Sequence, residues 1–574
     1  MDFKAMVEKV PRWILTGNEI EGIVESLIRE QPMPVHFARM LAIRGITSIR
    51  EATAFINPSL DDLRDPFLMK DMDKAVGRLK KAMNTGERIM VLGDYDVDGV
   101  CGTALFVRIM TSQGIKVHYH VPDRFKEGYG VSREAIDRAS VLGVTLIITV
   151  DSGITAFDEA EYVKSRGMDF IITDHHEPQA NQLPAAMAVL DPKLAGSSYP
   201  FRDLAGVGVM FKLLQALFID TGMDPADLYD DLDLVALGTA ADVVPLVDEN
   251  RVLARFGIER MKNTANTGLA ALMEISKAMK GRSNSNNIIY LLAPRLNAPG
   301  RLSSASKTVE LLTCENWLRA LEIADDIEKE NAIRREMNDR VYAEAEAMIR
   351  KLGQDVWNNG IVLASEHWHQ GVIGIAASRI VEKYYLPTVL ISLEGGVGKG
   401  SARSIKEFDI CGAMSECENI LDTYGGHKYA AGLSIKADKI EAFKHRFSEI
   451  ISRDLPSGIP APSITIDSEI DFSCLNGHMI NFLNKLSPFG ESNPIPLFLT
   501  RNLRAVSDAR VVGKNHLKFK LTDGAASFDA IGFNMGEFRD RVRSDAPPMD
   551  VLYNVEENEW MGKKTIQLVV KAIR

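Results

Sequence analysis

Three short apolar runs in the first half of the chain each lead into residues of the kinds that bind metal ions. The runs and the residues that follow them are 88–93 before Asp94, Asp96 and Asp98, 146–150 before Asp151, and 170–173 before Asp174, His175 and His176. Short β-branched runs separated by helical stretches predict buried strands of a parallel sheet. Because sites in such sheets form beyond the carboxyl ends of the strands, we expect these side chains to converge.

A fourth candidate of the same kind is Asp242, which follows the apolar residues Leu234, Val235 and Ala236. We expect Asp242 to stand at the carboxyl end of a fourth strand. Taken alone, Asp242 is as compatible with a helix cap as with a metal ligand, and a lone Asp151 is more typical of a cap or turn. The joint pattern over four strand ends favours a hydrolytic site that holds two metal ions.

The periodicity and the turn signals divide the 574 residues into five regions, as the length also suggests. A Pro-rich stretch at 455–462 reads as a linker, and the short strands after it are typical of an OB-type barrel. The predicted regions are a helical lead-in (1–85), a parallel α/β catalytic domain (86–265), a helical region that ends in a long connecting helix (266–353), a smaller α/β domain (354–455) and an OB-fold β-barrel (464–574).

Composition and charge narrow the class of protein. The chain is 46% hydrophobic and 25% charged, and no apolar run has the length of a membrane span. Its five cysteines are scattered without a CxxC pair, which argues against a disulfide framework and predicts a cytoplasmic protein. The net charge of −11 speaks mildly against a nucleic-acid-binding surface over the whole molecule, but local basic grooves are compatible with it.

The aspartates at 94, 96 and 98 alternate, so in an extended backbone they share one face. Carboxylates this close repel one another unless a cation or a proton intervenes, and Mg²⁺ or Mn²⁺ prefers such oxygen ligands. An EF-hand is the first alternative, but its loop needs a Glu at position twelve, where this chain has Leu105. A solvated acidic turn is the second.

The triplet Asp174-His175-His176 is a stronger signal than any single carboxylate. Imidazole is a good ligand for manganese or zinc, so one ring could bind a metal ion while its neighbour faces a substrate phosphate. Neutral histidines packed in the core are the alternative.

Several basic or glycine-rich segments are candidates for binding phosphate groups, because Arg binds phosphate bidentately and glycine-rich turns form anion-binding nests. The candidates are Arg124 and Tyr129 in the loop 123–130; Arg295, Asn297 and Arg301; Ser401 and Arg403; Gly425, Gly426 and His427; and Lys518 and Lys520, which alternate on one strand. For the arginines the alternative is an ion pair at the surface. For the glycine-rich segments it is an ordinary turn, and for Lys518 and Lys520 it is a strand face that only makes the protein more soluble.

Taken together, these motifs resemble the DHH phosphoesterase superfamily, and within it the bacterial exonucleases specific for single strands. The matching segments are GDYDVDG (93–99), VDSGI (150–154), TDHH (173–176), GTAADVVPL (238–246), RLNAPGR (295–301), WHQGVIGIAASRI (368–380), KGSARSI (399–405), GGHKYAAG (425–432) and PFGESNPIP (488–496). They cover nearly the whole chain in the family's order.

The resemblance implies a 5′-to-3′ exonuclease on single-stranded DNA that acts in recombination and repair. It implies a DHH domain, a DHHA1 domain, an OB-fold and two divalent ions, Mn²⁺ or Mg²⁺. It gives metal-ligand roles to Asp96, Asp98, Asp151, His175 and Asp242, with Asp151 bridging, and makes Asp94 either a further ligand or a close neighbour of the ligands. It gives a contact with the scissile phosphate to His176, and DNA-phosphate contacts to Arg124, Arg301, Ser401, Arg403 and His427. A repair helicase and a single-strand binding protein are the implied partners, and a monomer is the expected state.

Two other functions are compatible with the same motifs. One is a DHH enzyme that acts on short oligonucleotides or cyclic dinucleotides. The other is a non-catalytic replication scaffold with a DHH fold, although every ligand class expected of an enzyme is present here.

Overall fold

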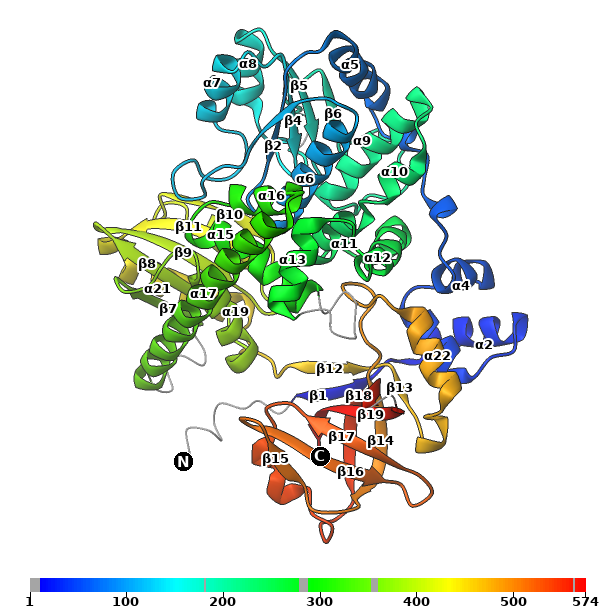
Figure 1. Cartoon of the computed structure of the whole chain (residues 1–574). Coiled ribbons are helices and arrows are strands. Elements are labelled where there is room, and N and C mark those ends of the chain that lie inside the picture. Colours follow the sequence, from blue (N-terminus) through cyan, green and yellow to red (C-terminus); the bar gives the residue numbers. More distant parts are fainter. Residues whose placement is uncertain (1–10, 180–181, 278–287, 353–359, 561–562) are drawn as a thin grey trace. The chain divides into compact units, whose positions relative to one another are not determined.

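The computed structural model describes residues 11–179, 182–277, 288–352, 360–560 and 563–574 (Figure 1). Its internal contacts define two compact units. The larger is built from Trp13–Gly300, Ser304–Asp325 and Thr465–Arg574, and the smaller mainly from Asp326–Ile464.

A five-stranded, all-parallel sheet forms the first core of the larger unit. Its strands are β2 (Ile89–Gly93), β3 (Val117–His120), β4 (Leu146–Val150), β5 (Asp169–Thr173) and β6 (Ala188–Leu190), in the order β3-β2-β4-β5-β6. The three apolar runs of the sequence are therefore strands, as predicted. The strand order reverses between β2 and β4, and ligands of doubly wound sheets bind at such a reversal.

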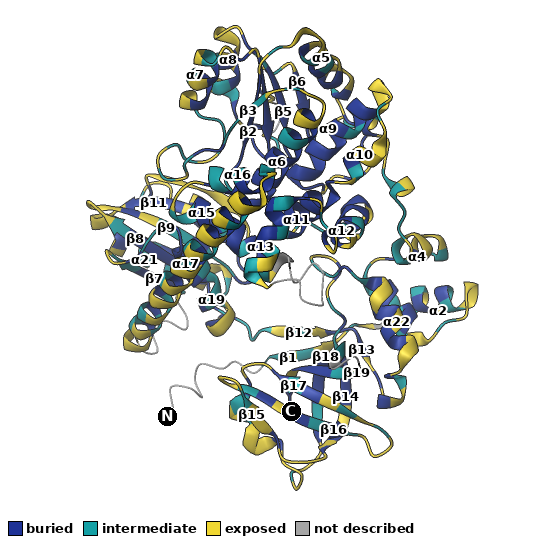
Figure 2. Cartoon of the chain, in the orientation of Figure 1, coloured by how far each residue is buried: buried dark blue, intermediate teal, exposed yellow. Residues whose placement is uncertain are grey.

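Helices cover both faces of this sheet. They are α5 (Met72–Thr85), α6 (Val97–Ser112), α7 (Arg133–Val141), α8 (Phe157–Ser165) and α9 (Gly206–Thr221). Met90 and Leu92 of β2 share a buried cluster with Ile136 of α7 and Val163 of α8. On α6, a Cβ at Gly102 would lie 2.5 Å from a Val150 methyl, so glycine permits the close approach of this helix to β4. Figure 2 shows β2, β4 and β6 as buried, whereas the edge strand β3 is of intermediate exposure.

The apolar run before Asp242 is a helix, so the expected strand end there is wrong. Leu234–Ala236 lies within α11 (Leu232–Ala241), and Asp242 is the C-cap residue of that helix. Every residue from Leu232 to Ala240 is buried. A helix buried all round has no polar face to mark its period, so a short run of it cannot be told from a buried strand.

The other helices of this unit precede the sheet or follow it. They are α2 (Glu21–Glu30), α3 (Val35–Ile43), α4 (Ile49–Ile56), α10 (Pro225–Tyr229), α12 (Asp248–Met261), α13 (Thr267–Ser276), α15 (Ala293–Leu302), α16 (Ser306–Thr313) and α22 (Gly477–Leu486). Near the N-terminus, β1 (Arg12–Leu15) pairs with β12 (Ser463–Ile466). The long helix α17 (Trp317–Leu352) ends the region 266–353, where a long connecting helix was predicted, and the boundary between the two units falls within it, after Asp325.

The C-terminal strands form the predicted β-barrel. They are β13 (Ser468–Glu469), β14 (Phe498–Ala505), β15 (Arg510–Val512), β16 (His516–Thr522), β17 (Ser527–Gly532), β18 (Met549–Trp560) and β19 (Lys563–Ile573). Their order is β13-β14-β18-β19-β17-β16-β15, and a further pairing of β14 with β16 closes the barrel. Phe498, Phe519 and Tyr553 fill the interior.

The smaller unit has a mixed sheet in the order β10-β11-β9-β8-β7. Its strands are β7 (Ile361–Ser365), β8 (Thr388–Glu394), β9 (Val397–Arg403), β10 (Thr423–His427) and β11 (Ala430–Lys436), and its helices include α19 (Ile373–Tyr384), α20 (Ile410–Ser415) and α21 (Ile440–Asp454). The last turns of α17 bury Val341, Ala345 and Ile349 in the same core as Phe443 and Phe447 of α21.

A buried arginine links α12 to α4, to the last residues of α22 and to the segment that follows α22. The Arg251 guanidinium donates to the carbonyl oxygens of Phe55, Lys485, Leu486, Ser487 and Pro488 at 2.8–3.4 Å. Burial lowers its pKa to about 9, so it stays charged at neutral pH.

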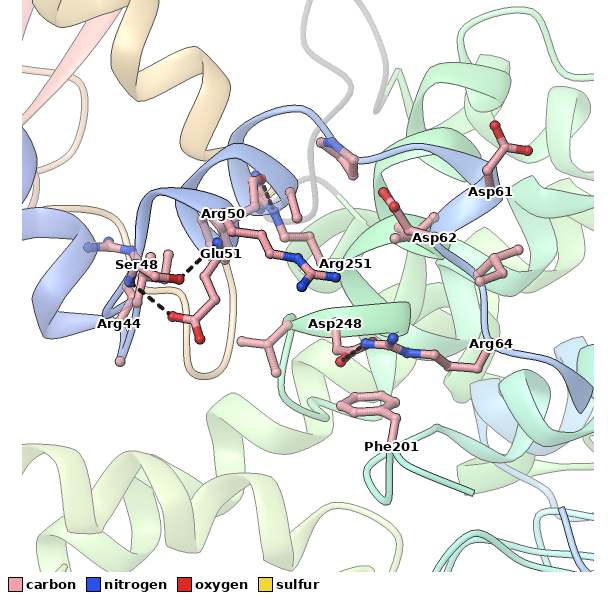
Figure 3. Close-up of a pocket in the computed structure, with 18 residues that line it drawn as sticks. Arg44, Ser48, Arg50, Glu51, Asp61, Asp62, Arg64, Phe201, Asp248 and Arg251 are labelled. Carbon is pink, nitrogen blue, oxygen red and sulfur yellow. Dashed lines mark hydrogen bonds and ion pairs between the residues drawn. The ribbon is translucent and has the colours of Figure 1, made fainter. Parts of the chain in front are cut away.

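Beside this contact lies an open pocket of about 1020 Å³. Figure 3 shows the Arg64–Asp248 ion pair and the side chain of Arg50 in it. Acidic and basic side chains occur there in equal number.

Candidate metal centre

The carboxyl ends of three adjacent strands deliver the first set of polar side chains. Asp94 follows β2, Asp151 follows β4 and the triplet 174–176 follows β5. The ladder continues one residue past the strands, because Asp94 N donates to Val150 O and Asp151 N to Thr173 O, at 3.2 and 3.1 Å. The backbone therefore holds Asp94 and Asp151 side by side at the reversal of the strand order.

Three overlapping groups of side chains could each hold a metal ion. They are Asp151, His175 and His176; Asp98, His175 and Asp242; and Asp94, Asp96 and Asp151. Within each group the ligand atoms lie within 4.8 Å of one another. The structure thus brings together all six predicted metal ligands and His176, and it places Asp151 and His175 in two groups each.

The three alternating aspartates do not share one face of an extended strand as expected. The helix α6 begins between them, with Asp96 as its N-cap, whose Oδ1 accepts from Asp98 N and Gly99 N at 2.9 and 3.1 Å. Asp98 points to the start of α9 and accepts from Gly206 N at 2.6 Å and Val207 N at 2.9 Å. The change from strand to helix therefore divides the carboxylates between two groups.

His175 lies at the middle of the cluster. Its Nε2 is 3.0 Å from Asp151 Oδ1, 3.6 Å from Asp242 Oδ2 and 4.0 Å from Asp98 Oδ2. None of these approaches has hydrogen-bond geometry. Three buried atoms therefore have no hydrogen-bond partner among the described residues: Asp94 Oδ1, Asp151 Oδ1 and His175 Nε2. Buried polar atoms without partners are rare, and here they converge on one place.

Asp174, the first residue of the triplet, orients the two histidines. Its Oδ1 accepts from His175 N and from the His176 backbone N, and it lies 2.8 Å from His176 Nδ1. Its Oδ2 accepts from Ile154 N. Burial alone would raise the pKa of Asp174, but these hydrogen bonds and the nearby imidazoles lower it. A carboxylate on Nδ1 fixes the ring of His176, so Nε2, which lies 3.4 Å from the Tyr129 hydroxyl, is the nitrogen that can face a substrate.

Burial and mutual repulsion make the cluster unfavourable in its fully charged form. Burial first, and then Asp96, raises the pKa of Asp98 to about 7, and burial followed by Asp98 raises that of Asp242 to about 9. Asp94 and Asp151 shift in the same direction for the same reasons. Burial lowers the pKa of His175 to about 3, so its ring is a neutral ligand. Oxygen donors with neutral imidazole fit Mn²⁺ or Mg²⁺, whose charge offsets this repulsion.

Metal-free protein is expected to lose stability as the pH rises from 7 to 9. In this window the folded state still holds a proton on Asp242, whose pKa is about 9, that the unfolded state has already released, whereas Asp98, whose pKa is about 7, loses most of its proton near the start of the window. Each such proton lowers the free energy of unfolding by about 1.4 kcal/mol per pH unit. Urea unfolding at several pH values measures this slope.

Saturating Mn²⁺ and the substitution Asp242→Asn should each flatten that slope. Below pH 6.5 the unfolded state binds a proton on His175 that the folded state does not, so there a rise in pH stabilises the folded protein. The pH window for the test therefore begins at 7. An equal slope with and without metal would contradict a metal site formed by these carboxylates.

The loop before α7 brings Tyr129 to the same place. Its hydroxyl donates to Asp151 O at 3.2 Å and lies 3.3 Å from His176 Nδ1. The Arg124 guanidinium lies over the Tyr95 ring, 5.2 Å from its centroid. Glu127 holds this loop by accepting from Asp123 N at 3.0 Å and from Ser132 Oγ at 2.6 Å.

The other predicted phosphate contacts lie in varied places. Arg295 is buried within α15, where its Nη1 donates to Leu291 O. Asn297 and Arg301 lie on the same helix, and Arg301 Nη1 donates to Gly371 O at 3.3 Å. In the barrel, Lys518 and Lys520 alternate on β16, as predicted.

In the smaller unit, the side chains of Ser401 and Arg403 on β9 lie against Gly374 in the first turn of α19. The contact is so close that a Cβ at Gly374 would be 2.8 Å from Ser401 Oγ and 2.9 Å from Arg403 Nη2. Gly425, Gly426 and His427 are not a turn. They lie in β10 paired with β11, and all three are exposed. The predicted turn is therefore wrong. Because β10 is the edge strand of its sheet, the ladder uses only the N–H groups that face β11, so a phosphate contact of this accessible segment stays a prediction.

Two residues of this region were not predicted from the sequence. Asp191 follows β6 as Asp151 follows β4; it is buried, and its Oδ2 has no partner among the described residues. The strand-end signal that identified the others applies to it too. Gly206 packs on Asp151, where a Cβ would lie 2.5 Å from the Asp151 Cβ, and only the fold reveals that contact.

Among the described residues, no helix combines the length and the apolar character that crossing a membrane requires.

Comparisons with known proteins agree with this architecture. Residues 88–239 match the DHH family N-terminal domain, residues 358–453 the DHHA1 domain and residues 466–572 the RecJ OB domain. The fold and the cluster therefore define a phosphoesterase of the DHH superfamily. The chain belongs to the RecJ family within it.

Three relatives establish this membership. The single-stranded-DNA-specific exonuclease RecJ of Bacillus subtilis is 39% identical over 99% of this chain and 71% of its own length. The RecJ of Escherichia coli is 34% identical, over 94% of this chain and 96% of its own length. The crystal structure of Thermus thermophilus RecJ with Mn²⁺ superposes with a TM-score of 0.82 at 30% identity, covering 98% of this chain and 79% of that one.

Proposed function

We propose that the protein is a metal-dependent exonuclease that hydrolyses single-stranded DNA from the 5′ end to 5′-mononucleotides, in DNA recombination and repair. The observation that carries this is the cluster around Asp151 and His175, in a chain whose relatives are named single-stranded-DNA-specific exonucleases. Structures of such relatives contain Mn²⁺ or Mg²⁺.

The residues that would hold two divalent ions are Asp94, Asp96, Asp98, Asp151, His175 and Asp242. When bound, such ions supply a hydroxide nucleophile near neutral pH and offset charge on the phosphate. Asp151, shared by two groups, would hold both ions in one place. The ring of His176, fixed by Asp174, would donate from Nε2 to a non-bridging oxygen of the scissile phosphate.

Substrate contacts would come from side chains outside the cluster. Tyr129 and Arg124 belong to the loop next to His176, and Ser401, Arg403 and His427 would hold DNA phosphates, including that of the 5′ end. A basic strand face with Lys518 and Lys520 suits single-stranded DNA. A repair helicase and a single-strand binding protein as partners, a monomeric state and a cytoplasmic location complete the proposal.

Degradation of a long 5′-labelled single strand tests the proposal. With Mn²⁺ we expect the label to be released first as a mononucleotide, and EDTA should stop the reaction. A duplex of the same sequence and a dinucleotide serve as competing substrates. Faster turnover of the dinucleotide or of a cyclic dinucleotide would favour the short-substrate enzyme, and no turnover with any metal would favour the non-catalytic scaffold.

A further inference from the structure

A pocket of about 500 Å³ at the amino-terminal ends of β2 and β3 concentrates positive charge. Its ionisable lining consists of Arg88, Lys116, His118 and Glu87. The chain as a whole carries a net charge of −11, so a basic pocket runs against its average.

The sheet register explains why the basic side chains converge. Ile89 pairs with Val117 and Met90 with His118, so Arg88 and Lys116 stand side by side just before the two strands. Residues two apart on a strand point to the same face. Lys116 and His118 therefore share the face on which Arg88 and Met90 lie. Met90 packs on α7, so this face is the one that α7 covers.

The acid in the pocket is already neutralised from elsewhere. Glu87 accepts from Arg78 Nη2 at 2.6 Å and also from the Thr145 hydroxyl. Arg88 donates from Nη1 to the neutral Leu142 carbonyl, which leaves its other N–H groups for a ligand. Among the described residues, the side chains of Lys116 and His118 have no hydrogen-bond or ion-pair partner. Burial, followed by the charges of Lys116, Arg88 and Arg138, lowers the pKa of His118.

We propose that this pocket binds a phosphate group, carried either by a mononucleotide or by the backbone of a DNA strand. A planar guanidinium beside an ammonium and an imidazole is a donor set that recognises phosphate. The volume lies in the range of small-molecule sites.

The pocket is separate from the metal cluster. Asp94 follows the carboxyl end of β2 and Arg88 precedes its amino end, so the five residues of the strand lie between them. At about 3.3 Å per residue they span about 17 Å. One phosphate cannot reach both places, so the pocket is a second site of the same unit.

The test uses the full-length protein in EDTA, so that no strand is cleaved. The C2 proton of His118 is followed by NMR, with His118→Gln identifying its signal, while inorganic phosphate, dAMP or a short single-stranded oligonucleotide is added. We expect saturable shifts and a raised pKa of His118, because an adjacent anion favours its charged form. Lys116→Glu should weaken this binding about tenfold or more, whereas Lys164→Glu, an exposed lysine on α8, should leave it unchanged.

The ligands distinguish the two sources of phosphate. A response to dAMP as strong as that to the oligonucleotide identifies a mononucleotide site, and a response to the oligonucleotide alone identifies a contact with the DNA backbone. Either result supports the proposal. If no ligand shifts His118, or if the shifts are the same in Lys116→Glu, the pocket does not bind phosphate, and the proposed nuclease function is unaffected because this measurement does not involve cleavage.

Discussion

Replacing Asp151 with Asn is expected to lower kcat/KM for single-stranded DNA by about 10³- to 10⁵-fold. Asp151 belongs to two of the three groups that could hold an ion, and its Oδ1 lies 3.0 Å from His175 Nε2. An amide keeps the volume of the side chain but removes the negative charge that two cations would share. Single-turnover cleavage of a 5′-labelled strand, with Mn²⁺ binding measured calorimetrically, checks both consequences.

The fold should survive this substitution. Asp151 has a φ of 59°, and Asn is among the residues that tolerate the left-handed region best. Because burial raises the pKa of Asp151, a neutral amide should leave the metal-free protein equally stable or more stable. Asp158→Asn removes an exposed carboxylate from α8 and should change neither activity nor metal binding. Near-normal cleavage by Asp151→Asn would place the reaction elsewhere.

Replacing Arg251 with Met should lower the free energy of unfolding by about 3–5 kcal/mol. Five carbonyl oxygens would lose the guanidinium as a donor. Those of Leu486 and Pro488 keep a bond from Asn493 Nδ2 and that of Ser487 one from Arg255 Nη1, so the loss falls most heavily on the carbonyls of Phe55 and Lys485. Met fills much of the same volume, so the loss would report the hydrogen bonds rather than a cavity. Chemical denaturation followed by fluorescence and by circular dichroism measures it.

Arg255 provides a matched control one turn further along the same helix. It is exposed, and its Nη1 reaches Asn484 O and Ser487 O at 3.4 and 3.2 Å. Arg255→Met should cost less than about 1 kcal/mol, because water can replace those bonds. Equal effects of the two substitutions would show that burial of Arg251 adds nothing to the stability of this junction.

The strands that carry the site were predictable from the sequence, and the reason is local. The runs at 88–93, 146–150 and 170–173 are short, β-branched and bounded by turn signals, and such segments have few other ways to bury their side chains. The same reasoning failed at Asp242, whose preceding run is a helix buried all round. It also failed at Gly425 and Gly426, where glycines that suggest a turn lie in a paired strand.

By itself, the sequence determined which residue types stand at the strand ends, and through its motifs it determined the superfamily. Only the tertiary structure decided which carboxylates meet. Asp98 lies in the first turn of α6, whereas Asp94 precedes that helix, so the two carboxylates belong to different groups. Two backbone amides at the start of α9 hold Asp98, and the end of α11 brings Asp242 to the same place. The physical reason is that the type of each residue and the spacing of apolar positions can be read from neighbouring residues in the chain. The distance between side chains that are far apart in the chain depends instead on how the helices pack on the sheet.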